Sequence, residues 1–186
     1  MATLTFHGAA QEVTGSCFEL KSKTTGRILL DCGMHQGGDA VERIETESFQ
    51  FDPAAIEHVV LSHAHLDHSG MLPRLHREGF RGTILCTEAT ANLLGIMLRD
   101  AAGLYQRDLE RTNVRNARRG RPQQEPVYDV ADVEAVLALC SGLSYGEPFA
   151  FPGGARLVFR DAGHILGSAM VRFRIGNGDE MRSLLF

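Results

Sequence analysis

Short apolar and β-branched runs recur along the chain and are bounded by glycine, proline or polar clusters. Runs of this length and composition are typical of β-strands. They predict strands at residues 3–6, 17–21, 27–30, 58–61, 83–86, 149–151, 157–160 and 169–175. Because strands occur towards both ends of the chain with helical segments between them, the pattern predicts a sheet-based α/β domain.

Apolar residues follow a helical period mainly in the middle of the chain. Thr87 is a candidate N-cap, and the apolar residues after it recur every three or four positions, as in a long amphipathic helix. A glycine-rich stretch at 31–38 and a polar stretch at 113–126 lack such a period and are predicted to be loops. The predicted helices cover residues 53–57, 69–78, 88–112 and 130–140.

Composition changes this picture little. The chain has 186 residues, 44% of them hydrophobic and 23% charged, which fits one ordinary globular domain. Its net charge of −4 gives no overall basic field that would favour nucleic acid. The four cysteines form no C-x-x-C pair, so we expect reduced thiols and a cytoplasmic protein. We expect no membrane association, because the sequence shows neither a signal peptide nor a long apolar run.

One short segment, residues 61–70, concentrates metal-binding side chains. His63, His65, Asp67 and His68 place three imidazoles and a carboxylate within six positions. Neutral imidazole and carboxylate are preferred ligands of zinc and similar divalent metals. The apolar run before them predicts a buried strand, so the cluster falls where open α/β folds place their chemistry. A polar turn with chance histidines is the alternative, and the density of the cluster disfavours it.

The spacing within the cluster favours a loop over a helix. Residues two apart face different directions on a helix, so one helical face cannot gather all four side chains. In a loop, His63 and His65 can bind one metal while Asp67 and His68 bind a second. Two metals about 3.5–4 Å apart would share a bridging hydroxide, an arrangement that hydrolyses phosphate esters and amides.

Two residues elsewhere in the chain are candidates for the same site. A catalytic zinc usually has at least three protein ligands, and His164 follows a predicted strand beside glycines that permit close backbone approach. Alone it would be an ordinary loop histidine, but beside the first cluster we favour a ligand. Asp31 ends another apolar strand, where a carboxylate either orients a ligating imidazole from behind or is a simple turn residue.

These residues match the motifs of a known family. His63-Ala-His-Leu-Asp-His68 resembles the H-x-H-x-D-H signature of the metallo-β-lactamase superfamily. Asp31 and His164 fall where that superfamily carries its first-motif aspartate and its third-motif histidine. The flanking segments 8–16, 30–34 and 161–168 resemble the β-CASP branch, which includes ribonuclease J and the endonuclease subunit of the pre-mRNA 3′-end processing complex.

The resemblance implies both a fold and an activity. The fold would be the αββα sandwich of the α/β (α+β) class. The activity would be zinc-dependent hydrolysis of single-stranded RNA, in endo- or exonuclease mode. A homodimer is a possible assembly that the resemblance leaves open. His63, His65 and His164 would hold the first zinc. Asp67 and His68 would hold the second and act as catalytic residues, with Asp67 also positioning or deprotonating the attacking water. Metal lowers the pKa of bound water to about 7, so no covalent enzyme intermediate is required.

The chain departs from the resemblance at its end. In the β-CASP branch, an aspartate that bridges both metals follows the third-motif histidine by about twenty-five residues, and a β-CASP domain and a C-terminal part come later. None of these has a counterpart here. We therefore expect residues 1–186 to be the N-terminal half of a metallo-β-lactamase domain, truncated in an apolar strand whose Leu184, Leu185 and Phe186 should be core. We expect one bound zinc, a weak second site and little or no nuclease activity of this chain alone.

A run of arginines follows the predicted long helix. Arginine pairs with phosphate, so this run could guide an RNA strand to the metals. A solvated surface loop is the alternative, which the sequence slightly favours. The run consists of Arg111, Arg115, Arg118, Arg119 and Arg121.

Two other functions compete with RNA hydrolysis. A different metallo-β-lactamase-fold hydrolase, such as a thioesterase or lactonase, fits the H-x-H-x-D-H cluster but not the flanking segments. A non-catalytic fragment or pseudo-enzyme subunit fits the missing C-terminal ligand, but not the intact set of histidines.

Overall fold

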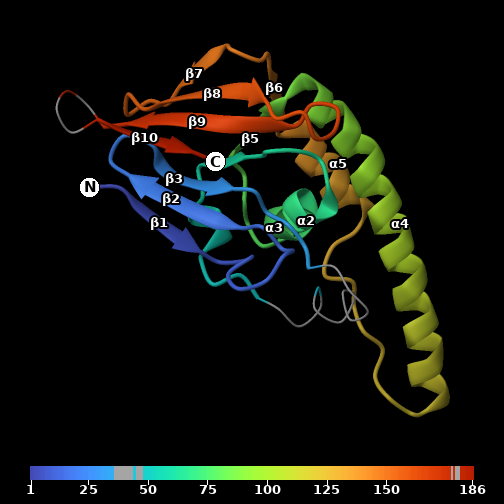
Figure 1. Cartoon of the computed structure of the whole chain (residues 1–186). Coiled ribbons are helices and arrows are strands. Elements are labelled where there is room, and N and C mark those ends of the chain that lie inside the picture. Colours follow the sequence, from blue (N-terminus) through green and yellow to red (C-terminus); the bar gives the residue numbers. More distant parts are fainter. Residues whose placement is uncertain (36–43, 45–47, 177, 179–180) are drawn as a thin grey trace.

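Figure 1 shows a computed structural model of the chain, which describes residues 1–35, 44, 48–176, 178 and 181–186. The described helices are η1 (Pro53–Ala55), α2 (Leu66–Ser69), α3 (Leu72–Arg77), α4 (Glu88–Arg118) and α5 (Val130–Ala138). The described strands are β1 (Thr3–Phe6), β2 (Phe18–Ser22), β3 (Gly26–Leu30), β4 (His58–Val60), β5 (Thr83–Thr87), β6 (Cys140–Leu143), β7 (Pro148–Ala150), β8 (Arg156–Asp161), β9 (Ala169–Ile175) and β10 (Arg182–Leu185).

The strands form two sheets. The first has the order β1-β2-β3-β4-β5-β6, antiparallel from β1 to β3 and parallel from β3 to β6. The second has the order β10-β9-β8-β7 and is antiparallel throughout. Because β3, β4 and β5 run in the same direction, the loops that follow them emerge at one edge of the first sheet.

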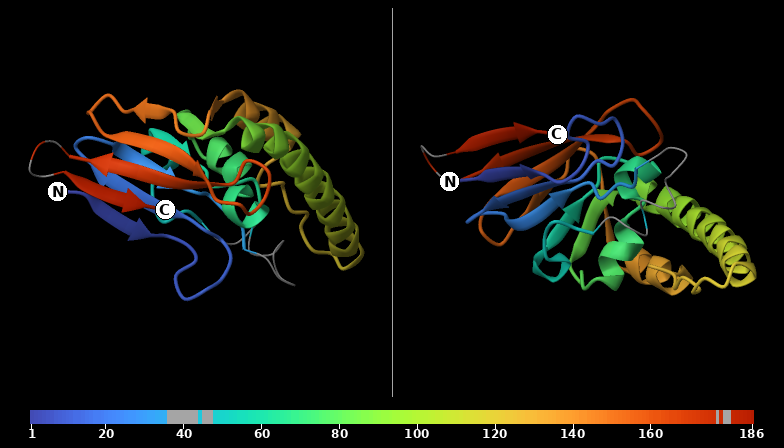
Figure 2. Two further views of the ribbon diagram at one scale, coloured as in Figure 1. Left: turned by 45° about the horizontal axis from the view of Figure 1, so that its top comes forward. Right: turned by 90° about the horizontal axis from the view of Figure 1, so that it is seen from below.

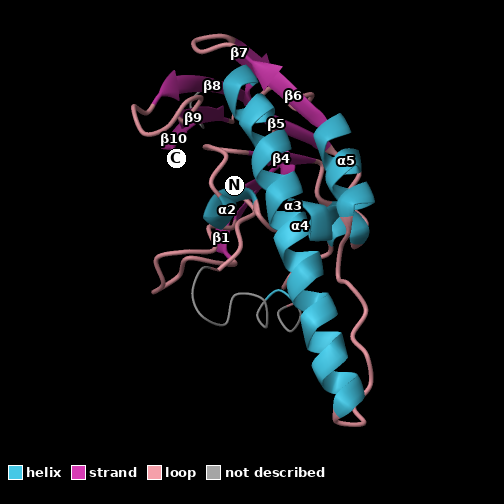
Figure 3. Cartoon of the chain, turned by 90° about the vertical axis from the view of Figure 1, so that its right-hand side faces the viewer, coloured by secondary structure: helices cyan, strands magenta, loops and turns pink. Residues whose placement is uncertain are grey.

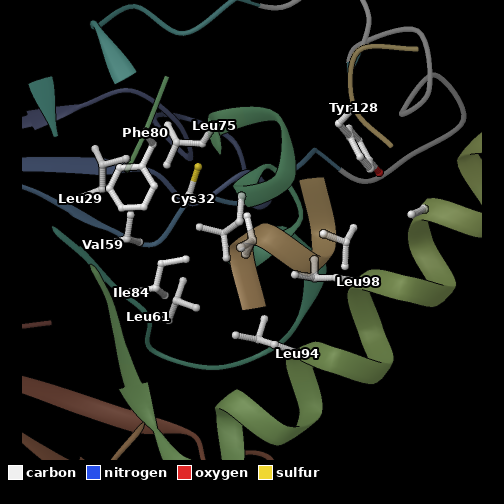
Figure 4. Packing of buried hydrophobic residues seen from close by; sticks show 14 of the residues in the cluster. Leu29, Cys32, Val59, Leu61, Leu75, Phe80, Ile84, Leu94, Leu98 and Tyr128 are labelled. Carbon is white, nitrogen blue, oxygen red and sulfur yellow. The ribbon is translucent and has the colours of Figure 1, made fainter. Parts of the chain in front are cut away.

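Successive residues of the central strands enter two different hydrophobic cores. In β3, Leu29 packs on the helix side, whereas Ile28 and Leu30 pack against the second sheet. The same alternation in β4 and β5 buries both faces of the first sheet, which explains why these strands are continuous apolar runs. Figure 2 shows the resulting layers, with α3, α4 and α5 on one face of the first sheet and the second sheet on the other. Figure 4 shows the helix-side core, where Leu29 lies beside Phe80 and Val59, with Ile84 and Leu61 on the side towards Leu94 of α4.

The outer face of the second sheet is polar. Buried and exposed residues alternate strictly along β9, with Val171 and Phe173 buried and Arg172 and Arg174 exposed. Such alternation is typical of an antiparallel sheet with one solvated face. In the described part of the chain no helix covers this face, so the layers are helix, sheet and sheet. The predicted mixed α/β class is confirmed.

The helix predicted at 69–78 is two helices. α2 ends at Ser69, and α3 begins at Leu72 with Pro73 in its first turn. A proline has no backbone N–H and is best accommodated at the start of a helix, so Pro73 opens a new one. Between the two, a Cβ at Gly70 would lie 2.6 Å from the Leu66 carbonyl oxygen and 2.7 Å from Met34, so the backbone packs too closely for any side chain.

The long helix α4 continues to Arg118, so the prediction of a loop from residue 113 is wrong for its first six residues. The side-chain amide of Asn113 donates to the carbonyl of Gln124 at 2.9 Å and accepts from its N–H at 2.8 Å. This pairing with the returning chain holds the polar last turns in helical form. The helix ends before Gly120, whose φ of +65° suits a residue without Cβ.

Two smaller predictions differ from the structure, and part of a third is not tested by it. The helix predicted at 130–140 ends at Ala138, and Cys140 begins the short strand β6, whose polar sequence depends on pairing with β5. Leu184 and Phe186 are partly buried, but Leu185 is 65% exposed, so it is not core. Residues 36–38 of the predicted glycine-rich loop lie outside the described residues.

The structure also bears on the cysteines and on membranes. All four cysteines are free thiols, three of them buried. Within the described residues, no helix combines the length and apolarity needed to cross a bilayer.

His58 on β4 provides a pH test of the packing between the two sheets. Its ring lies 5.4 Å from the ring of Phe151 and 6.1 Å from that of Phe149. Burial lowers the pKa of His58 more than the neighbouring Glu57 carboxylate raises it. The unfolded chain therefore binds a proton here at a pH where the folded chain does not, and stability falls as pH drops below about 6.5.

We expect His58→Phe to remove part of this acid sensitivity. The measurement is the free energy of urea unfolding at pH 7.5 and pH 5.5 for both proteins. The wild type should lose more stability on acidification than the variant. An equal loss in both proteins would show that His58 makes no contribution.

Candidate metal centre

Three chain segments meet through their backbones to shape the cluster. The N–H groups of Ser16, Cys32 and Met34 donate to the carbonyl oxygens of Asp67, His68 and Leu66, at 2.8, 2.8 and 2.9 Å. These bonds hold the turn that carries His65 to His68 against the loop after β3 and against the segment before β2. Gly33 lies at the contact, and a Cβ there would overlap the carbonyl of Asp67. Backbone packing at this point therefore requires glycine.

Three histidines converge from two sheets. His63 and His65 follow β4, and His164 lies in the loop between β8 and β9. His63 Nε2 is 3.1 Å from His65 Nδ1, and His164 Nε2 is 3.3 Å from the same His65 atom. In the described part of the chain, these residues form the only group of three or more His, Cys, Asp or Glu side chains whose ligand atoms all lie within 4.8 Å of one another.

The spacing of these nitrogens suits a tetrahedral metal. Zinc–nitrogen bonds are 2.0–2.1 Å long, which places neighbouring ligands of a tetrahedral zinc roughly 3.3 Å apart. The distances from His65 Nδ1 to His63 Nε2 and to His164 Nε2 are both close to this value. Three nitrogens would leave a fourth position open, as catalytic zinc sites do. The donor set therefore fits a divalent metal such as zinc.

His63 is kept neutral. Burial, and then the neighbouring imidazoles of His68, His65 and His164, lower the pKa of His63 to about 4, against an opposing effect of Asp67. A neutral imidazole has a nitrogen lone pair for a metal, whereas a protonated one does not. Burial and the neighbouring rings, which lower the pKa of His63, therefore leave its nitrogen lone pair free to bind a metal ion.

The carboxylate of Asp31 organises the imidazoles behind this group. Asp31 is fully buried and accepts hydrogen bonds from Ser62 N–H at 2.8 Å, Ser62 Oγ at 2.9 Å and Ser16 Oγ at 3.2 Å. The Ser62 hydroxyl has one hydrogen, which it donates to Asp31 in a hydrogen bond. In the second hydrogen bond of Ser62 Oγ, to His63 Nδ1 at 2.9 Å, the hydroxyl oxygen must therefore accept and His63 Nδ1 must donate. That tautomer leaves His63 Nε2 unprotonated and directed at His65.

His68 donates a hydrogen bond directly to the same carboxylate. Its Nδ1 is 2.6 Å from Asp31 Oδ2, and its Nε2 is 3.6 Å from Asp67 Oδ2. Burial lowers the pKa of His68, but the hydrogen bond and charge of Asp31, with a smaller effect of Asp67, leave it raised. Asp67 and His68 thus adjoin each other, but in the described residues no third ligand group joins them.

The loop that carries His164 is held at its far end by two buried threonines. The hydroxyls of Thr87 and Thr90, at the start of α4, donate to the carbonyl of Gly167 at 2.7 and 2.9 Å. Ser168 Oγ accepts from the backbone N–H of His164 at 3.1 Å and from the next N–H at 3.2 Å. These bonds tie the loop of the second sheet to the helix layer, and so place His164 beside His63 and His65.

Sequence reasoning missed the residues that position the ligands. Ser16 and Ser168 lie in segments that resemble the β-CASP branch, but the resemblance gave them no role, and Ser62 and Thr90 were not singled out at all. Their roles appear only when distant segments meet. Thr87 was predicted as an N-cap, and its hydroxyl does accept from the N–H of Thr90, but its bond to the loop of His164 was not foreseen. Glycines next to candidate ligands were the one available signal of close backbone approach.

Comparison with known proteins identifies the family. The sequence profile described as "Metallo-beta-lactamase superfamily" matches residues 11–158. The chain belongs to this superfamily. The resemblance seen in the H-x-H-x-D-H cluster is thereby confirmed at the level of the family.

Named relatives lie among RNA-related members of the metallo-β-lactamase superfamily. The chain is 42% identical over 164 residues to Ribonuclease TTHA0252 of Thermus thermophilus, covering 88% of this chain and 33% of the relative. It is 35% identical over 181 residues to the transcription termination factor FttA of Cenarchaeum symbiosum, covering 95% of this chain and 25% of the relative. These names agree with the resemblance to the β-CASP branch. The chain spans about a quarter to a third of the length of these curated relatives.

Solved structures show the same superfamily fold. A metallo-β-lactamase of Cronobacter sakazakii superimposes with a TM-score of 0.57 at 18% identity, covering 97% of this chain and 57% of that one. At this level of identity the likeness concerns the fold alone.

Substitutions at two glycines can test whether the contacts of Thr87 and Thr90 with Gly167 position the loop of His164. A Cβ at Gly167 would lie 2.5 Å from the N–H nitrogen and 2.7 Å from the hydroxyl of Thr90, whereas a Cβ at Gly163 meets nothing within 4 Å. Both glycines have left-handed φ values, +82° and +67°, so alanine costs similar backbone strain at either position. We expect Gly167→Ala to displace His164 and to weaken zinc binding by roughly 10- to 100-fold, as loss of a supporting contact does.

The measurement is zinc affinity by competition with a chromophoric chelator, with thermal unfolding as a check on folding. Gly163→Ala is the matched control and should keep near wild-type affinity. Equal zinc affinity in the two variants would contradict a positioning role for the Gly167 contact.

Proposed function

We propose that the chain carries the metal centre of a zinc-dependent hydrolase that cleaves RNA phosphodiester bonds. The convergence of three imidazole nitrogens beside Asp67 and His68 carries this proposal. The 42% identity to a protein named as a ribonuclease supports RNA over other substrates of the fold. Since the chain spans about a third of that relative, the proposal concerns the activity of the complete enzyme.

Each side chain has a distinct role in this proposal. His63 Nε2, His65 Nδ1 and His164 Nε2 would bind the first metal. When bound, a divalent metal lowers the pKa of water to about 7 and stabilises charge on a phosphoryl group. Asp67 would orient the attacking water and accept its proton, and His68 would bind a second cation with Asp67. Asp31 would keep His68 oriented through its bond to Nδ1.

The two metal positions differ in the number of ligands that support them. Three imidazoles surround the first position, whereas Asp67 and His68 alone adjoin the second within the described residues. Fewer ligands give weaker binding, so we propose one tightly held metal in this chain. Efficient phosphodiester cleavage by two metals would need further ligands at the second position.

Metal content provides the first test. We expect about one zinc per chain after dialysis, measured by atomic emission, because only the histidine group offers three ligands. His63→Ala should lose the tightly bound zinc. His58→Phe removes a histidine outside the group and should keep it.

Two outcomes would contradict the assignment. Retention of tight zinc by His63→Ala would mean that the metal binds elsewhere. Two tightly bound zincs in the wild type would contradict a weak second position.

Substrate class provides the second test. With zinc or manganese present, single-stranded RNA, a thioester and a lactone are compared for turnover. We expect any turnover to be slow, confined to RNA and abolished by His63→Ala. Turnover of the thioester or lactone would contradict RNA specificity, and fast RNA cleavage that depends on His63 would contradict the weak second position.

If no substrate is turned over, a binding measurement can still test the metal centre. Cobalt in place of zinc gives a visible spectrum that responds to ligands of the metal. We expect a dinucleotide with a phosphorothioate linkage to change the spectrum of the wild type but not that of His63→Ala. An unchanged spectrum would contradict a phosphodiester-binding metal centre.

A further inference from the structure

The outer half of α4 carries a row of arginines on one face. We call Arg107, Arg111, Arg115 and Arg118 the arginine stripe. Their spacing of four, four and three residues brings the side chains to the same side of a helix, and they border one shallow surface depression. All four are exposed. Figure 3 shows that this half of α4 extends beyond the sheets, with the returning chain beside it.

The stripe is a local concentration of positive charge. From residue 107 to residue 121 the sequence has six arginines and two acidic residues, Asp108 and Glu110, although the whole chain has a net charge of −4. Among the described residues, only Arg111 of the stripe has an ion pair, with Asp108 at 3.2 Å, and both side chains are exposed. Exposed pairs of this kind contribute little energy, so the guanidinium groups are available to a ligand.

The opposite side of the helix explains why the stripe faces outward. Tyr105 and Leu109 are buried, and Tyr105 stacks on Tyr128 of the returning chain with ring centroids 5.0 Å apart. Asn113 pairs with the backbone of Gln124 one turn further on. These contacts fix the rotation of α4, so the arginines project away from the segment that packs on it.

We propose that the arginine stripe binds the phosphate backbone of an RNA strand that extends from the metal centre. This inference rests on the proposed function, because that function identifies RNA as the substrate. Guanidinium groups pair with phosphate oxygens through two parallel hydrogen bonds and read no base sequence. Residues four apart on a helix are separated by about 6 Å along its axis, so the stripe offers a regular series of charges to a regular polyanion.

The position of α4 connects the stripe to the site. Thr90 contacts the loop of His164, and the stripe begins 17 residues and ends 28 residues further along the helix. At 1.5 Å per residue, the stripe lies about 26 to 42 Å from that contact. A stacked strand advances about 3.4 Å per nucleotide, so about 8 to 12 nucleotides would separate the stripe from the reacting phosphate. The stripe is therefore a remote binding surface and not part of the catalytic group.

The test is RNA binding without cleavage. A 20-nucleotide single-stranded RNA of mixed sequence, labelled with a fluorophore, is titrated with metal-free protein at 50 to 200 mM salt. The test variant replaces all four stripe arginines by glutamine, which preserves helix propensity. We expect at least a tenfold loss of affinity at 50 mM salt. The slope of log affinity against log salt should become shallower by about 2 to 3, as expected for four lost phosphate contacts on a single strand.

The chain offers a control of equal charge. Arg156, Arg160, Arg172 and Arg174 are exposed on the outer face of the second sheet. Their replacement by glutamine should leave RNA affinity within about threefold of the wild type. Replacement of the stripe by lysine keeps the charge and should retain most of the affinity, while circular dichroism confirms that each variant is folded.

Three results would overturn the proposal. One is equal loss of affinity in the stripe and sheet variants, which would indicate only the overall charge of the chain. Another is unchanged affinity in the stripe variant. The last is equally effective displacement of the RNA by polyglutamate of the same charge, which would indicate an acidic protein partner.

The stripe and the proposed function can fail separately. Stripe-dependent RNA binding in a protein that acts on a thioester would overturn the function and keep the surface. Cleavage of RNA that is insensitive to the stripe substitutions would keep the function and overturn the surface. His63→Ala should leave the binding loss caused by the stripe substitutions unchanged.

Discussion

The arrangement of the candidate metal centre depends on one fully buried carboxylate, that of Asp31. A buried charge is tolerated only when hydrogen bonds satisfy it, and Asp31 has three partners in two segments, Ser16 in one and Ser62 and His68 in the other. By accepting a hydrogen bond from Ser62 it determines which nitrogen of His63 carries hydrogen, and by accepting one from His68 Nδ1 it does the same for His68. One side chain that touches no reacting group thus prepares two imidazoles at once.

The same site also depends on how the two sheets pack. His63 and His65 belong to the first sheet, whereas His164 belongs to a loop of the second. Their separation is set by the core between the sheets, where Leu30 and Val60 meet residues such as Phe159, and by the threonine hydroxyls that hold Gly167. Ligand geometry in this protein is therefore a product of hydrophobic packing as much as of the motif itself.

The sequence was informative where the physical signal is local. The central strands are continuous apolar runs because both of their faces are buried, and their limits were predicted to within one or two residues. The dense histidine cluster indicated the candidate ligands for similar reasons. Signals failed where distant segments decide the structure: the last turns of α4 need Gln124, the strand β6 needs β5, and the tautomer of His63 needs Asp31. None of these partners can be inferred from neighbouring residues.

The depressed pKa of His63 has a consequence for how the protein would acquire a metal. Metal ions and protons usually compete for the same imidazole lone pair, so uptake of a metal releases protons and weakens in mild acid. Burial and the surrounding rings lower the pKa of His63 to about 4, so its imidazole is already neutral at neutral pH and no proton competes with the metal there. Metal loading at this nitrogen would thus release no proton to the buffer at neutral pH.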